Sequence, residues 1–125
     1  MSRAASRPNC GPAAVAALAG LDVDLVMEAY QHQWNLGPRW NGRSHLSRLV
    51  ATAKLLGLIL NPERGARGSL RTWVSSEAIP DRRYLIRVGD HFVAFIDGKI
   101  IDQDGEDRLK DLGSKRVTHV YFVRS

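Results

Sequence analysis

The single cysteine of the chain, Cys10, stands where a helix is expected to begin. Asn9 is a common N-cap residue, Pro12 is tolerated in a first turn, and the segment 13–19 is rich in alanine. The free N–H groups and the dipole of a helix N-terminus stabilise a thiolate, the reactive form of cysteine. Cys10 is therefore a candidate nucleophile, with its own N–H as an oxyanion donor and Gly11 leaving room for a substrate. The alternative is an ordinary buried thiol.

A carboxylate is expected beside His91 because a β-hairpin is predicted there. Asp97-Gly98 lies between two β-rich segments and is a strong signal for a two-residue turn. Counting outward from that turn pairs His91 with Asp104 and places Asp102 on the diagonal, within about 7–8 Å. An acid at either position would orient the imidazole and stabilise its protonated form. A bulge would change this count, and the alternative is a surface histidine among solvated acids.

The remaining candidate residues carry weaker signals. One cysteine permits no internal disulfide and no two-cysteine zinc motif, so neither a metal nor a cofactor is expected. His32, His45 and His119 are expected to be structural or solvated. Trp40, in a polar loop, is a candidate wall of a substrate cleft.

The elements that must position these residues suggest an α+β domain covering residues 1–125, with N-terminal helices packed on a C-terminal antiparallel sheet. After the helix that begins at Cys10 and stops at Gly20, further helices are expected to be capped by Asp22 or Asp24, by Ser44 and by Ser69. The expected strands are segments 84–88, 91–96, 99–102 and 117–123.

Composition limits the class of protein. The 125 residues are 44% hydrophobic and 25% charged, which is typical of a soluble globular domain. There is no apolar run of the roughly 20 residues needed to span a bilayer and no secretory signal pattern, and a lone thiol fits a reducing compartment such as the cytoplasm. The net charge of +5 is scattered, so nucleic-acid binding has no support beyond charge. The densest basic stretch is a candidate site for an acidic partner: Arg64, Arg67 and Arg71.

Two segments resemble papain-like cysteine peptidases. The run NCGPAAVAAL at residues 9–18 resembles their nucleophile segment, especially that of domains that process bacteriocin leader peptides. The run YLIRVGDHFVAFIDGKIID at residues 84–102 is similar to their histidine strand and the strand after it. The order and spacing also resemble short phage and bacterial proteins of this superfamily, over about residues 7–123.

The resemblance implies a papain-like fold with Cys10 as nucleophile, His91 as general base and acid, and Asp102 as the residue that orients His91. The hairpin count alone favours Asp104, which stays the alternate. The family usually has an oxyanion-binding glutamine about six residues before the cysteine, where this chain has Ala4. Asn9, Ser6 or backbone N–H groups are the candidates to replace it.

The activity that this implies is hydrolysis of an amide in a peptide or protein, through an acyl-enzyme on Cys10. Acyl transfer to an amine would use the same three residues. The alternative from a different class is a papain-like scaffold used only for binding, which the basic surface and the missing glutamine favour.

Overall fold

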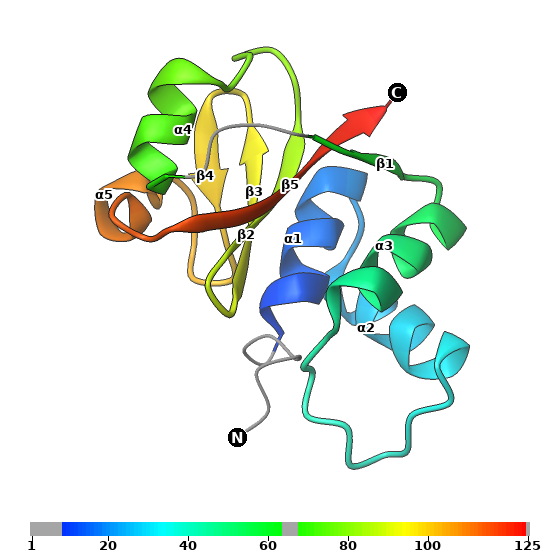
Figure 1. The fold of residues 1–125 in the computed structure, drawn as a ribbon. Coiled ribbons are helices and arrows are strands. Elements are labelled where there is room, and N and C mark those ends of the chain that lie inside the picture. Colours follow the sequence, from blue (N-terminus) through cyan, green and yellow to red (C-terminus); the bar gives the residue numbers. More distant parts are fainter. Residues whose placement is uncertain (1–8, 64–67, 125) are drawn as a thin grey trace.

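An antiparallel sheet flanked by helices forms the computed structural model, which describes residues 9–63 and 68–124 (Figure 1). Within these residues there are five helices and five strands, in the sheet order β1-β5-β2-β3-β4. The α+β class expected from the sequence is confirmed. In chain order the elements are α1 (Cys10–Ala19), α2 (Val23–Gln33), α3 (Leu46–Leu55), β1 (Ile59–Pro62), α4 (Leu70–Ser76), β2 (Tyr84–Val88), β3 (His91–Ile96), β4 (Lys99–Ile101), α5 (Leu109–Leu112) and β5 (Val117–Arg124).

Helices cover both faces of the sheet (Figure 1). Because side chains alternate along a strand, β3 contributes to two separate hydrophobic clusters. Phe92 and Ala94 pack with α1, α2 and α3, whereas Val93 and Phe95 pack with α4 and α5. The central strands are thus buried on both faces, and the sheet forms a rigid frame for the side chains at the ends of its strands.

Most helix ends follow the expected signals. Gly20 ends α1 in the left-handed region, Asp22 caps α2 by accepting from the N–H of Asp24 at 3.0 Å, and Ser69 caps α4. The cap expected from Ser44 is wrong, because α3 begins at Leu46 after His45 and has no side-chain cap. Ser44 is instead fully buried.

Asn9 precedes α1, but it does not cap the helix through its side chain. Its backbone is left-handed, with φ at 67°, a conformation that asparagine tolerates better than most residues. Its N–H donates to the carbonyl of Gly42 at 2.8 Å. This bond attaches the loop between α2 and α3 to the residue just before Cys10.

The space expected to open at Gly11 is filled by the chain itself. A Cβ atom built on Gly11 would lie 2.1 Å from Oγ of Ser44, 3.0 Å from Leu49 and 3.4 Å from Phe92. Gly11 therefore lets α3 and β3 approach the first turn of α1, and the idea that it leaves room for a substrate is wrong.

Replacing Gly11 with alanine should destabilise the protein. The clash with a fully buried hydroxyl should cost about 1–3 kcal/mol in the free energy of unfolding, an overpacking effect that exceeds the roughly 1 kcal/mol of helix propensity gained. Denaturant unfolding measures this difference. Gly37→Ala, where no heavy atom lies within 4 Å of the added Cβ, is the control and should be nearly neutral. Adding Ser44→Ala should restore part of the loss, and no restoration would contradict the clash.

Among the described residues, no helix alone has the length and apolar character to cross a bilayer. Helices α1 and α2 meet that requirement only as a pair, with a bend of 116° between them.

Candidate active site

The β3–β4 hairpin brings a carboxylate to His91, but not through the strand pairing obtained by counting outward from the turn. The pairs Ile96–Lys99 and Phe95–Ile100 form as the Asp97-Gly98 turn predicts. The ladder ends one pair further on, at Ile101, because the chain then turns back on itself in a bridge between residues 102 and 105. The expected pair of His91 with Asp104 is therefore wrong.

Asp102, not Asp104, contacts the imidazole. Its Oδ2 lies 2.8 Å from Nε2 of His91, and both side chains are buried. Its Oδ1 accepts the backbone N–H of Asp104 at 2.9 Å. The Asp104 carboxylate itself is about half exposed and lies 3.8 Å from Arg108. Asp102 is also the acid that the resemblance to papain-like peptidases implies.

Arg108 completes the surroundings of Asp102, and no sequence pattern pointed to it. Its Nε lies 3.1 Å from Oδ1 of Asp102, and its Nη1 donates to Asp111 at 2.7 Å. The N–H of Arg108 donates to the carbonyl of Ile100 at 2.7 Å, which fixes the returning chain against β4. An arginine amid acids that are close in sequence looks like an ordinary surface ion pair, so only the fold assigns it to the site.

The charge of Asp102 is stabilised at this position. Burial alone would raise the pKa of its carboxyl, but the hydrogen bonds from His91 and Asp104 and the positive charges of Arg108 and His91 together lower the pKa below its ordinary value. Asp102 is therefore ionised over the physiological pH range and can hold an imidazolium.

Cys10 interacts with His91 from the first turn of α1. Burial would lower the pKa of His91, but hydrogen bonding to Cys10 and Asp102, together with their charges, raises it above its ordinary value. Since Nε2 faces Asp102, Nδ1 is the ring nitrogen left for the sulfur. Nδ1 is itself buried and has no hydrogen-bond partner at standard geometry within the described residues, so it is open to the sulfur. The order sulfur, imidazole, carboxylate is the order that nucleophilic catalysis needs.

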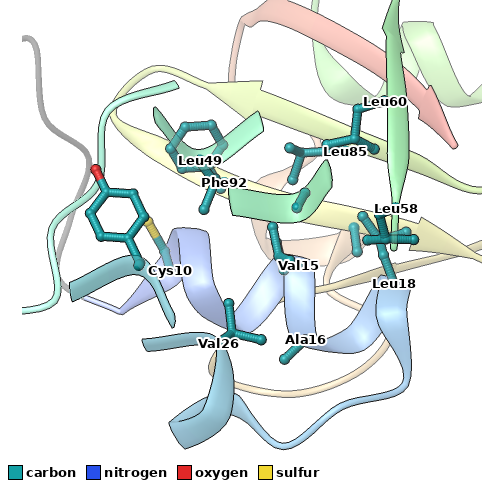
Figure 2. Close-up of a cluster of buried hydrophobic side chains, with 14 residues drawn as sticks. Cys10, Val15, Ala16, Leu18, Val26, Leu49, Leu58, Leu60, Leu85 and Phe92 are labelled. Atoms are coloured by element: carbon teal, nitrogen blue, oxygen red, sulfur yellow. The ribbon is translucent and has the colours of Figure 1, made fainter. Parts of the chain in front are cut away.

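All three side chains are enclosed. Cys10 is 0% exposed, His91 3% and Asp102 7%. Figure 2 shows the sulfur of Cys10 within a cluster that includes Leu49 and Phe92. A substrate can therefore reach the sulfur only if the side chains that cover it move.

The other candidate residues are more scattered. Asn9 is exposed, Gly11 is packed under Ser44, and Ser6, Arg64 and Arg67 lie outside the described residues. Arg71 is exposed on α4, and its N–H donates to Gly113.

Trp40 lies on the loop that Asn9 holds through Gly42. Its ring stacks on Tyr30, with centroids 5.1 Å apart, and its indole N–H donates to the carbonyl of Arg43 at 2.7 Å. The ring is half-buried and lines a small pocket.

The three other histidines lie apart in sequence and structure. His32 is exposed on α2, His45 precedes α3, and His119 on β5 has its Nδ1 3.2 Å from the Thr118 hydroxyl. Over the described part of the chain, no three histidine, cysteine or acidic side chains converge as metal ligands would.

Comparison with known proteins identified no relative of this chain. No family model, no curated protein and no solved structure matches the chain. Any function must therefore be argued from the side chains themselves.

Proposed function

We propose that this domain is a papain-like cysteine hydrolase that cleaves an amide bond in a peptide or protein. The observation that carries the proposal is the buried series of Cys10, His91 and Asp102, in which Asp102 is hydrogen-bonded to His91 and paired with Arg108. A structural thiol needs neither an imidazole nor a carboxylate that orients the imidazole. The resemblance of the cysteine and histidine segments to papain-like peptidases supports the same reaction class.

The reaction follows from the roles that these positions allow. The Cys10 sulfur, its proton held by His91, attacks the amide carbonyl, and the oxygen takes up the negative charge near the N–H of Cys10. As the C–N bond breaks, the imidazolium gives its proton to the leaving amine. Water then attacks the thioester, His91 takes a proton from it, and the acid and the free thiol are released. Asp102 accepts the Nε2 hydrogen bond throughout and stabilises the imidazolium.

Two alternatives use the same fold. Acyl transfer differs only in that an amine replaces water in the second step. A binding module without catalysis is favoured by one specific observation, the complete burial of Cys10. In that case the thiol belongs to the core, and access to it needs unfolding.

Alkylation of Cys10 by iodoacetamide across pH tests the proposal. The rate should show an inflection well below pH 8.5, about the pKa of an ordinary thiol, because the imidazolium and the helix N-terminus stabilise the thiolate. His91→Gln should move the inflection towards that ordinary value.

The same experiment in low urea tests access to the sulfur. Alkylation in the folded protein should change little with denaturant, because local opening exposes little surface. A rate that rises as steeply as global unfolding, with the ordinary thiol inflection, would instead favour the binding module.

A further inference from the structure

A small pocket beside the nucleophile helix is lined by cationic and aromatic side chains. It measures about 230 Å³ and lies between α2, the loop that follows it and the start of α3. No acidic residue contributes to its wall. Its lining residues are Tyr30, Leu36, Trp40, Asn41, Arg43, His45 and Arg48.

The guanidinium of Arg43 lacks the partners that such a group normally has. Its Nε is buried and makes no hydrogen bond among the described residues, and no carboxylate of those residues pairs with it. A buried N–H donor that bears charge is costly to leave unpaired. Because Arg43 lines the pocket, an anionic ligand bound there would lie beside a guanidinium that has no carboxylate partner among the described residues.

Arg48 adds a second positive charge to the pocket, and its guanidinium forms no ion pair with a carboxylate of the described residues. Its guanidinium lies over the ring of Trp34, 5.2 Å from the centroid. Burial raises the pKa of Tyr30, while the backbone N–H of His45 and the charge of Arg48 act in the opposite direction. Arg48 itself lines the pocket, so its positive charge lies in the pocket wall.

We propose that this pocket binds a carboxylate of the peptide substrate. A guanidinium fork matches a carboxylate in shape and charge. The half-buried ring of Trp40, stacked on the buried Tyr30, offers a flat wall for the attached carbon atoms. The small volume suits one short acidic group. This inference rests on the proposed function, because only that function makes the bound ligand a substrate.

The position of the pocket fits such a role. The loop that carries Trp40 and Arg43 is held to Asn9 through Gly42, and Asn9 directly precedes Cys10. Tyr30 and Cys10 belong to the same buried cluster. This pocket differs from the acidic-partner site expected from the sequence, which comprised Arg64, Arg67 and Arg71.

Titration of the full chain with small carboxylates, followed by NMR, tests the proposal without turnover. The probes are N-acetylglutamate N-methylamide for an acidic side chain, N-acetylalanine for a chain end, the glutamine analogue as the neutral match, and inorganic phosphate. At least one carboxylate should give saturable shifts at the Arg43 Nε–H and the Trp40 indole N–H. The glutamine analogue should bind at least about tenfold more weakly, since a hydrogen bond to a charged group contributes about 1.5–3 kcal/mol. Phosphate should also bind at least about tenfold more weakly, because it has no carbon atoms to pack against the aromatic wall. Which carboxylate binds identifies the source of the group.

Variants separate a specific site from general attraction to a basic protein. Arg43→Gln should weaken binding at least about tenfold, and Arg48→Gln, at an exposed position, should weaken it less. Arg39→Gln removes the same charge from the same loop without lining the pocket, so it should leave affinity unchanged. Equal binding of phosphate or of the glutamine analogue, or equal effects of Arg39→Gln and Arg43→Gln, would overturn the proposal. These binding measurements do not depend on Cys10 chemistry, so their failure and the failure of the alkylation test are distinct results.

Discussion

Asp102→Asn should slow acylation of Cys10 by on the order of 10⁴-fold, the scale seen when the orienting acid of a serine-protease triad is neutralised. The N–H of Asp104 donates to Oδ1 of Asp102, so an asparagine would keep its oxygen there and turn its NH2 group toward Nε2 of His91. This orientation holds the imidazole in the wrong tautomer, and the neutral amide does not stabilise the imidazolium. The measurement is the burst of p-nitrophenol on mixing with p-nitrophenyl acetate, whose small acyl group suits an enclosed thiol. The pKa of His91, followed by NMR, should fall in the same variant because the charge and hydrogen bond of Asp102 raise it.

Asp104→Asn is the matched control for this prediction. Its carboxylate is about half exposed and lies only at the edge of the Arg108 cluster, so the burst rate should change by less than about threefold. Equal small effects of the two variants would mean that neither acid orients His91.

The Asp102 variant should also lose stability in a pH-dependent way. Because the pKa of Asp102 is lowered by folding, its stabilising contribution is present above the ordinary carboxyl pKa of about 3.9 and is lost as the pH falls through the folded value. The difference in unfolding free energy between wild type and Asp102→Asn should therefore shrink in acid.

Cys10→Ala should abolish the burst completely while leaving the fold intact, because the thiol supplies the only nucleophile in the proposed reaction. The variant should also lower the pKa of His91. Burial alone depresses that pKa, and the interactions with Cys10 help to raise it above its ordinary value. NMR titration of the His91 ring, with circular dichroism as the check on folding, measures both expectations.

Cys10→Ser provides the finer control. A hydroxyl keeps the hydrogen bond to His91 but does not supply a stable anion, so the burst should still vanish while the His91 pKa falls less than in Cys10→Ala. The stabilisation linked to the raised His91 pKa is present below about 6.5 and is lost as the pH rises through the folded value. The alanine variant should therefore differ most from wild type in stability at mildly acidic pH. An unchanged His91 pKa in Cys10→Ala would be incompatible with a working pair.

The sequence by itself determined the features that depend on neighbours in the chain. Helix α1 begins at Cys10 and stops at Gly20 because alanine propagates a helix and glycine accepts a left-handed backbone. The β3–β4 register next to Asp97-Gly98 follows from the turn type. These local rules were enough to predict the α+β class and to select Cys10 and His91 as candidates.

Only the tertiary structure decided what depends on residues far apart in sequence. A turn at residues 102–105 replaced Asp104 with Asp102, and packing against Ser44 filled the space at Gly11. The enclosure of Cys10 and the contribution of Arg108 were equally invisible, as was the short strand β1. The physical reason is that pattern and propensity act over a few residues, whereas burial and charge pairing depend on which elements meet.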